Sequence, residues 1–443
     1  VCRSYLPATI VTRVRLSMPY GCAEPLTLRA SDCDYPLMFP ECIECRGVNG
    51  MCGIDPCPLL SEIKRGLPQT EPTSLDDMSG PSPPSLFVGR YGYPSVRAGL
   101  SASWAQDSNA PLPSSGDPSD LFGKPLEEVA ARHAHLVTGG RNMPISSPCD
   151  PGPVLEATQV IAMASGPVDV EMDFNRPVSI GGGPTFDSMS TPLGPSGEVV
   201  RAEVISHVSI PRKVDSVVGE TDLLANDAME ELTASGVGEA HVSRILSSGL
   251  LGKEGNRRLV PTRWGITATD DTLSKQQWER VRHMPSLDKV LAFDATYLDN
   301  RFHVILTPGP WAFHMLEAWC QGSVWATHGQ VLEDWEDLEP RTEYAHSITG
   351  AYYATRLAVL EYMERIGRSG ACLVWRDIGP EYWAPVGVWL IRETVREAMK
   401  RNPRVFDTIN EAVSHVSPRI SSPDDLRSSW FVNRRRQTRL DSF

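Results

Sequence analysis

The C-terminal third of the chain alternates segments of helical periodicity with a short apolar run, and this alternation strongly restricts the possible folds. Residues 309–320 (GPWAFHMLEAWC) and 349–367 (TGAYYATRLAVLEYMERIG) carry wide apolar faces, so both are predicted as helices. Residues 371–378 (ACLVWRDI) are typical of a buried strand, and residues 386–402 (VGVWLIRETVREAMKRN) of a helix that ends in basic residues. A helix bundle would not include the strand. We therefore predict mixed α/β or α+β layers.

Strand patterns also occur nearer the N-terminus. Residues 168–174 (VDVEMDF) alternate apolar and polar side chains, which is the pattern of a half-buried strand. Residues 86–99 (LFVGRYGYPSVRAG) combine strand-forming residues with three glycines and a proline. Because 443 residues are enough for two or three domains, we expect a two-part α/β body.

The charge of the chain limits its partners. A net charge of −13 and a pI near 5.3 exclude broad, charge-driven coating of nucleic acid, so any DNA contact must come from a local patch or through a partner. No run of about 18 apolar residues occurs, so we expect no membrane span. The first residue is Val, and no uninterrupted apolar stretch of a signal peptide follows it. Residues 1–38 are expected to be an N-terminal extension that is disordered or follows an alternative start.

Four of the ten cysteines lie close together, at Cys42, Cys45, Cys52 and Cys57. Four thiolates can surround zinc as a tetrahedron at about 2.3 Å, and the intervening glycines and prolines allow the tight turns of a small site. We therefore predict a zinc knuckle, with structural zinc, at residues 39–65. An iron–sulfur cluster is an alternative, as are four buried or disulfide-linked cysteines.

Three carboxylates in the half-buried strand are candidates for catalysis. Asp169, Glu171 and Asp173 alternate along the strand and therefore share one face. Carboxylates grouped in this way can hold Mg²⁺, as in a metal-dependent nuclease or phosphoesterase acting on nucleic acid. The alternative is the solvated face of a strand that buries its other side.

The segment RRLVPTRW, residues 257–264, is a candidate for binding nucleic acid or phosphate. It contains three arginines and a tryptophan: Arg257, Arg258, Arg263 and Trp264. Arginine can grip phosphate, and an aromatic ring can stack on a base. The alternative is a structural arginine that pairs with Asp270 or Asp271.

The chain becomes polar and rich in arginine from Ser417 onward, which predicts an exposed, disordered tail. Near its end, Gln437, Leu440 and Phe443 recur three residues apart. In a 3₁₀ turn such side chains line one edge, as in a peptide that binds the groove of another protein. The alternative is a frayed terminus with a chance spacing.

Several separate segments together resemble the archaeal Nre family of DNA repair proteins. They are CIECRGVNGMCGIDPCP (42–58), GPSPPSLFVGRYGYPSVRAG (80–99), AMASGPVDVEM (162–172), LVPTRWGITATDDT (259–272), ITGAYYATRLAVLEYM (348–363) and RDIGPEYWAPVGVWLIRETVREA (376–398). The resemblance covers nearly all of the chain from about residue 40. It divides the body into a domain of the Nre N-terminal type at 66–330, one of the C-terminal type at 331–425, and a tail at 426–443.

The resemblance implies a cytoplasmic archaeal protein that acts in DNA damage repair. It also implies a C-terminal motif that binds the replication sliding clamp, PCNA, and Gln437, Leu440 and Phe443 match that motif. Many such motifs end in two consecutive aromatic residues, whereas here Ser442 precedes Phe443, so we expect a weaker complex. The tail arginines would favour encounter with an acidic clamp surface. Neither the resemblance nor the motifs assign an enzymatic activity.

Overall fold

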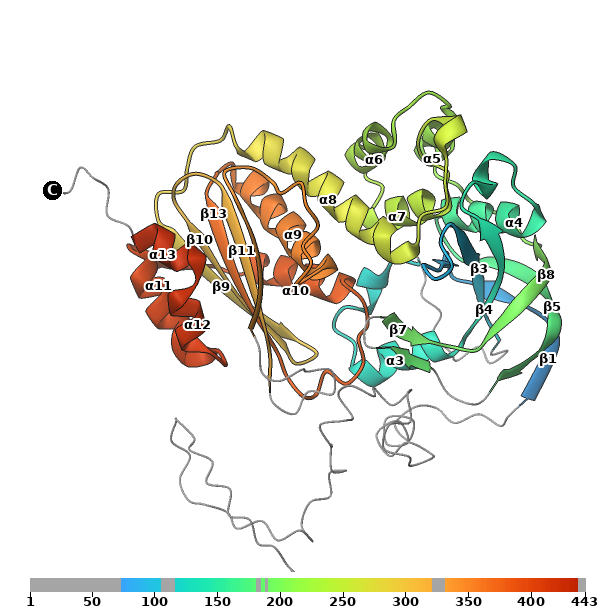
Figure 1. The fold of residues 1–443 in the computed structure, drawn as a ribbon, viewed down its shortest axis with the longest axis horizontal. Helices are drawn as coiled ribbons and strands as arrows, with labels where there is room; N and C mark the ends of the chain where they lie inside the picture. The colour runs from blue at the N-terminus through green and yellow to red at the C-terminus, as the bar shows by residue number, and fades with distance from the viewer. Residues whose placement is uncertain (1–72, 105–115, 181–184, 188–189, 321–330, 437–443) are drawn as a thin grey trace, which may run out of the picture. The chain divides into compact units, whose positions relative to one another are not determined.

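A computed structural model of the chain describes residues 73–104, 116–180, 185–187, 190–320 and 331–436. These residues belong to one unit, Met38–Phe443. Within this part of the chain the structure contains two six-stranded sheets and helices that pack on them (Figure 1). The prediction of a mixed α/β fold is confirmed.

The first sheet has the strand order β1-β5-β8-β4-β3-β2. Its strands are β1 (Thr73–Ser82), β2 (Leu86–Val88), β3 (Ser95–Ser103), β4 (Leu136–Pro144), β5 (Val168–Ile180) and β8 (Ser196–Val204). Only β4 and β8 pair in parallel, and every other pair is antiparallel. The sheet is therefore built mainly from antiparallel neighbours.

The alternating pattern of residues 168–174 forms the strand that it predicts. Val168, Val170 and Met172 of β5 are buried, while the polar residues between them face outward. Helix α4 (Pro153–Met163) supplies Val154, Ala157 and Ile161 to the same hydrophobic cluster. Burial of each large apolar side chain contributes about 1.5–3 kcal/mol, which holds one face of the sheet to the helix.

The second sheet has the strand order β12-β11-β13-β10-β9-β14. Its strands are β9 (Val290–Tyr297), β10 (Asn300–Thr307), β11 (Ala312–Trp319), β12 (Val331–Asp337), β13 (Ala371–Ile378) and β14 (Arg404–Phe406). Only β11 and β13 are parallel neighbours. The predicted domain boundary between residues 330 and 331 falls inside this sheet, because β9, β10 and β11 precede it and the other strands follow it.

The prediction of a helix at residues 309–320 is wrong, because β11 occupies this segment. Phe313 and Met315 face one hydrophobic cluster, and Ala312 and Leu316 face another on the opposite side of the sheet. A strand buried on both faces is apolar at nearly every position, so its pattern also satisfies a helix with a wide apolar face.

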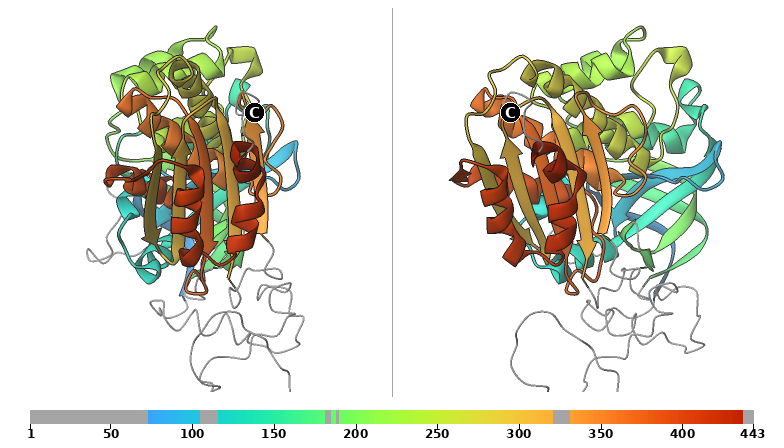
Figure 2. Two further views of the ribbon diagram at one scale, coloured as in Figure 1. Left: turned by 90° about the vertical axis from the view of Figure 1, so that its left-hand side faces the viewer. Right: turned by 60° about the vertical axis from the view of Figure 1, so that its left-hand side comes forward.

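Helices cover both faces of the second sheet (Figures 1 and 2). On one side lie α9 (Gly350–Ile366) and α10 (Trp389–Lys400), with α8 (Thr262–Val281) packed against α9. On the other side lie α11 (Ile409–Val416), α12 (Pro423–Ser428) and α13 (Trp430–Arg436). The predictions of helices at 349–367 and 386–402 and of the buried strand at 371–378 are confirmed. Helix α9 ends at Gly367 in the left-handed conformation, φ 63°.

The prediction of an exposed, disordered tail from Ser417 onward is wrong as far as Arg436. Leu426, Phe431 and Val432 are buried against the second sheet. These few apolar residues lie in a polar, arginine-rich stretch, so their common buried face was not evident from composition. The described chain ends in a packed helix, and residues 437–443 lie outside it.

The described residues contain four further helices. They are α3 (Leu126–Ala134), α5 (Arg212–Gly219), α6 (Ala225–Ala234) and α7 (Glu239–Ser247), with single 3₁₀ turns at Pro118–Leu121, Ser147–Cys149, Glu254–Asn256 and Ser417–Arg419. Strands β6 (Thr185–Asp187) and β7 (Ser190–Leu193) pair with each other as a separate two-stranded sheet. Within the described ranges, none of the helices combines the length and the apolar character that crossing a membrane requires.

A histidine in α7 is expected to make stability depend on pH. Burial, together with the positive charge of neighbouring Arg244, lowers the pKa of His241 to about 4. In the unfolded chain a histidine titrates near 6.5, so below that pH the unfolded state binds more protons than the folded state. The free energy of unfolding should therefore fall as pH drops from 6.5 to about 4, with His241 contributing about 2 kcal/mol of the loss.

Urea denaturation at pH 7 and pH 4.5 tests this contribution. The His241→Gln protein should lose less free energy of unfolding than the parent between the two pH values, whereas the same change at the exposed His207 should leave the loss unchanged. Equal losses in the parent and the His241→Gln protein would contradict the assignment.

Candidate nucleic-acid interface

The three carboxylates lie on β5, which neighbours the edge strand β1 of the first sheet. Asp169 and Glu171 are exposed, and Asp173 lies 3.7 Å from the guanidinium of Arg201 on the neighbouring strand β8. Among the residues that the structure describes, no group of three or more His, Cys, Asp or Glu side chains is placed to hold a metal ion. The trio lies on the solvated face of a half-buried strand, and the Mg²⁺ site stays a prediction.

The predicted zinc ligands Cys42, Cys45, Cys52 and Cys57 lie outside the described residues. The zinc knuckle at residues 39–65 therefore stays a prediction.

Two arginines of the predicted phosphate-binding segment hold the backbone of their own neighbourhood. Arg257 donates to the carbonyl oxygens of Gly252 at 3.0 Å, Val218 at 2.8 Å and Glu220 at 3.0 Å. Arg258 donates to the carbonyl of Gly255 at 3.2 Å. Burial also lowers the pKa of Arg257. Both guanidinium groups therefore have a structural role, while their positive charge stays close to the surface.

Trp264 has a different environment, because it lies among other exposed aromatic side chains. Its own exposed fraction is 46%, and its ring centroid lies 5.6 Å from that of Tyr93, which is 52% exposed. Tyr91, two residues before Tyr93, is 77% exposed, and the guanidinium of Arg90 lies 5.0 Å from the centre of its ring. We call Arg90, Tyr91, Tyr93 and Trp264 the aromatic surface.

Hydrogen bonds join the segments that carry the aromatic surface. Arg90, Tyr91 and Tyr93 lie in the turn between β2 and β3, and Trp264 lies in the first turn of α8. The backbone N–H of Val88 at the end of β2 donates to Thr262 Oγ1 at 2.9 Å. Ile145 N donates to the carbonyl of Pro94 at 2.9 Å, and Leu259 N donates to that of Ile145 at 2.8 Å. Hydrogen bonds therefore hold the turn between β2 and β3 close to the start of α8.

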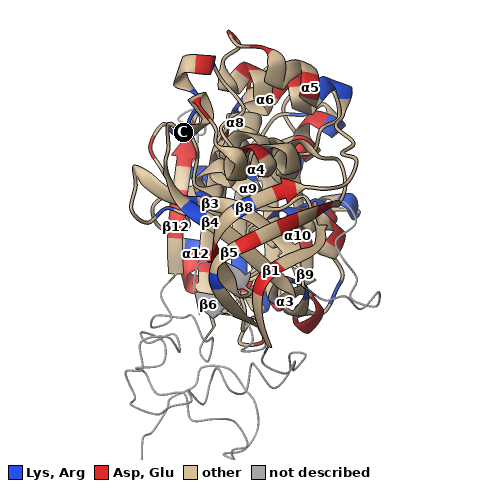
Figure 3. Cartoon of the chain, turned by 90° about the vertical axis from the view of Figure 1, so that its right-hand side faces the viewer, with Lys and Arg blue, Asp and Glu red and all other residues tan. Residues whose placement is uncertain are grey.

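The surroundings of the aromatic surface are basic in an acidic protein. Residues 86–104, 136–149 and 255–269 contain no Asp or Glu, and they carry six arginines: Arg90, Arg97, Arg141, Arg257, Arg258 and Arg263. Acidic residues gather at the other edge of the same sheet, along β1 and β5 (Figure 3). The first sheet therefore has one acidic edge and one basic edge, and the aromatic side chains lie at the basic one.

Residue patterns identified only part of this surface. Trp264 was found because arginines flank it, but Arg90, Tyr91 and Tyr93 were missed. A usable signal was present, since the segment GRYGYP places two tyrosines and an arginine between turn-forming glycines and a proline. Aromatic residues in such a turn have little chance of burial, and their exposure could have been expected.

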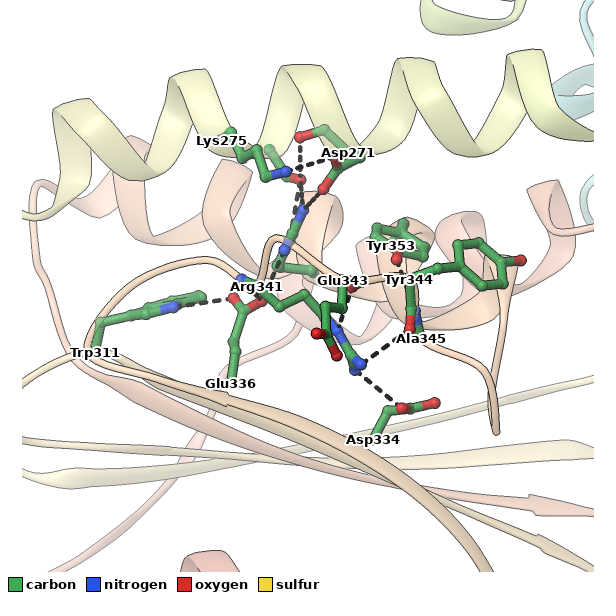
Figure 4. A network of polar contacts seen from close by, with 12 residues as sticks. Asp271, Lys275, Trp311, Asp334, Glu336, Arg341, Glu343, Tyr344, Ala345 and Tyr353 are labelled. Atoms are coloured by element: carbon green, nitrogen blue, oxygen red, sulfur yellow. Dashed lines mark hydrogen bonds and ion pairs between the residues drawn. The ribbon is translucent and has the colours of Figure 1, made fainter.

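Ion pairs with two buried arginines hold the helix that begins at this surface. Asp270 of α8 is fully buried and accepts two hydrogen bonds from Arg392 of α10, at 2.7 and 2.8 Å. Asp271 accepts from Arg356 of α9, which also donates to Glu336 of β12 at 2.8 Å. Figure 4 shows this second network, with Asp271 on helix α8 and Glu336 on the sheet below it. The predicted alternative paired an arginine of residues 257–264 with Asp270 or Asp271. In the structure these two carboxylates pair with arginines of α10 and α9.

The last described helix, α13, is tied to the second sheet. Arg435 donates to the carbonyl oxygens of Pro308 at 3.0 Å and Pro310 at 2.8 Å. The ring of Trp430 stacks on Trp335 of β12, with centroids 4.4 Å apart. The candidate clamp-binding residues Gln437, Leu440 and Phe443 follow this helix and lie outside the described residues.

Comparison with known proteins shows similarity along nearly the whole chain. The N-terminal profile of the archaeal Nre family matches residues 51–326, and the C-terminal profile matches residues 336–443. The DNA repair protein NreB of Archaeoglobus fulgidus is 35% identical over 413 residues, which cover 91% of this chain and 100% of the relative. The DNA repair protein NreA of the same organism is 34% identical over 408 residues, covering 91% of this chain and 98% of the relative.

A relative from a second archaeon shows the same degree of similarity. The DNA repair protein NreA of Haloferax volcanii is 35% identical over 361 residues, covering 80% of this chain and 85% of the relative. No solved structure matches the chain. The resemblance inferred from separate motifs is thus confirmed, and the chain belongs to the archaeal Nre family.

Proposed function

We propose that the chain is a DNA repair factor. The observation that carries this proposal is the similarity to relatives that are named DNA repair proteins, because it extends over 91% of this chain and all or nearly all of two of them. A basic edge on an otherwise acidic protein is consistent with local contact to DNA.

Recruitment to DNA is assigned to the end of the chain. Gln437, Leu440 and Phe443 have the spacing of a motif that binds the sliding clamp PCNA, and the match to the C-terminal Nre profile extends to Phe443. Because α13 is tied to the second sheet as far as Arg435, a clamp held by residues 437–443 would stay close to the protein body.

Deleting residues 437–443 is expected to abolish binding to the sliding clamp of the same organism. Calorimetry with the full chain should give a complex of micromolar or tighter affinity, near −8 kcal/mol, because a short peptide motif in a groove supplies about this free energy. The triple alanine variant of Gln437, Leu440 and Phe443 should behave like the deletion.

The control is Ser442→Ala, which changes the tail outside the motif and should keep the parent affinity. Undiminished binding by the deleted chain would place the clamp contact elsewhere on the protein. If the full chain does not bind the clamp, recruitment through this motif is wrong.

A further inference from the structure

We propose that the aromatic surface binds unpaired nucleotides of single-stranded DNA, with bases stacked on Tyr91, Tyr93 and Trp264. The inference rests on the proposed role in DNA repair and names the form of DNA that the protein contacts. Base stacking on exposed rings is tolerant of sequence, because every base has an aromatic face.

Exposure distinguishes these rings from the other aromatic side chains. In the described part of the chain five aromatic residues are exposed: Tyr91, Tyr93, Trp264, Trp335 and Tyr344. Trp335 stacks nearly parallel on Trp430, and Tyr344 stacks on Tyr353, with interplanar angles of 15° and 24°. Tyr93 and Trp264 are tilted by 52° and do not stack face to face. Tyr93 and Trp264 therefore do not cover each other's faces as a parallel pair would, and each side chain is about half exposed.

The positions of the rings are defined before any ligand arrives. Tyr91 and Tyr93 lie in a turn closed by Gly92, whose φ of 83° suits glycine, and the Ser95 N–H donates to the Gly92 carbonyl at 2.9 Å. Trp264 lies in the first turn of a 20-residue helix whose Asp270 and Asp271 form ion pairs with the buried Arg392 and Arg356. Little ordering entropy would be lost on binding, which favours affinity.

Charge selects the partner. The three segments that carry or adjoin the rings contain six arginines and no acidic residue, while the whole chain has a net charge of −13. An anionic polymer would be attracted to this edge and repelled elsewhere. A nucleic acid strand provides both elements that the surface would recognise, a phosphate backbone and planar rings.

Unpaired DNA fits the surface better than a duplex does. In a duplex the faces of the bases are stacked on each other, so exposed rings cannot reach them without unstacking. A duplex is instead held mainly through many phosphate contacts, which a chain with a net charge of −13 disfavours.

Fluorescence anisotropy with the full chain and labelled oligonucleotides tests the inference. The probes are a single-stranded DNA of about 16 nucleotides, its duplex, an abasic strand of the same length, and the RNA equivalent. The single-stranded DNA should bind most tightly, and removal of the bases should weaken binding at least tenfold. Equal binding of the abasic strand, or tighter binding of the duplex or the RNA, would overturn the proposal.

Single substitutions locate the contact. Tyr93→Ala and Trp264→Ala should each weaken binding of single-stranded DNA about tenfold, because one stacked base is lost. Trp264→Phe keeps a ring and should stay within about threefold of the parent. Tyr344→Ala removes an exposed ring elsewhere and should have no effect. If Tyr93→Ala and Trp264→Ala both bind like the parent, the surface is not the binding site.

Failure of this inference can be distinguished from failure of the proposed recruitment to the clamp, because different residues are assigned to the two binding activities. Trp264→Ala should still bind the clamp, and the chain without residues 437–443 should still bind single-stranded DNA. A chain that binds the clamp but no oligonucleotide overturns this inference alone. A chain that binds oligonucleotides through the aromatic surface but not the clamp supports it, and only clamp recruitment fails.

Discussion

Replacement of Arg356 by methionine is expected to lower the free energy of unfolding by about 3–5 kcal/mol. The guanidinium is fully buried between α8, α9 and β12. It donates to Asp271, to Ser274 Oγ at 2.9 Å and to Glu336 at 2.8 Å, and these carboxylates together raise its pKa against the effect of burial. Methionine fills a similar volume but leaves Glu336 as a buried carboxylate without its cation, and that unpaired charge is the main cost.

A matched control lies on the same pair of helices. Arg280 of α8 pairs with Glu364 of α9 at the surface, where the arginine side chain is 48% exposed. Arg280→Met should cost no more than about 1 kcal/mol, because water replaces the lost partner. Urea denaturation of both variants at pH 7 gives the comparison.

A second variant separates the cost of the unpaired charge from the loss of packing. Adding Glu336→Gln to Arg356→Met removes a buried charge, so the double variant should regain part of the lost stability. Similar losses for Arg356→Met and Arg280→Met, or no recovery in the double variant, would contradict the assigned role of this network.

The sequence predicted elements whose pattern has a single interpretation. Helix α9 ends at a glycine, and α10 has polar residues on one side, so their periodicity and boundaries were clear. Strand β11 was misassigned because Phe313 and Leu316 are buried on opposite faces of one strand. The local sequence does not show whether other elements cover one face of a strand or both. The apolar residues of β11 therefore fitted a helix as well as a strand.

The candidate site was predictable only in part for a related reason. Arg257 and Trp264 belong to one motif, yet the first caps backbone carbonyls and the second is exposed beside Tyr93. Residues 93 and 264 are brought together by tertiary structure, and no single-sequence pattern links positions so far apart. Similarly, the partners of Asp270 and Asp271 come from α10 and α9, more than 80 residues away along the chain.

A glycine in the interior of β3 shows how the basic edge is built. At Gly99 a Cβ atom would lie 1.9 Å from the carbonyl oxygen of Gly139 and 2.6 Å from Cα of Gly140, both backbone atoms of β4. Strand β4 cannot retreat easily, because Gly139 itself adjoins Val199 Cγ2 and Met172 Sδ. Only glycine permits this approach of the two strands.

Gly99→Ala is therefore expected to cost about 3 kcal/mol or more of the free energy of unfolding, since no side-chain rotation relieves a contact with backbone. It should also weaken binding of single-stranded DNA, because β3 continues from the turn that carries Tyr91 and Tyr93. The control is Gly219→Ala at the end of α5, where no atom lies within 4 Å of the added Cβ. That change should be neutral or stabilise the protein by up to about 1 kcal/mol. Urea denaturation measures both variants, and a Gly99→Ala protein as stable as the parent would show that β3 and β4 can separate without cost.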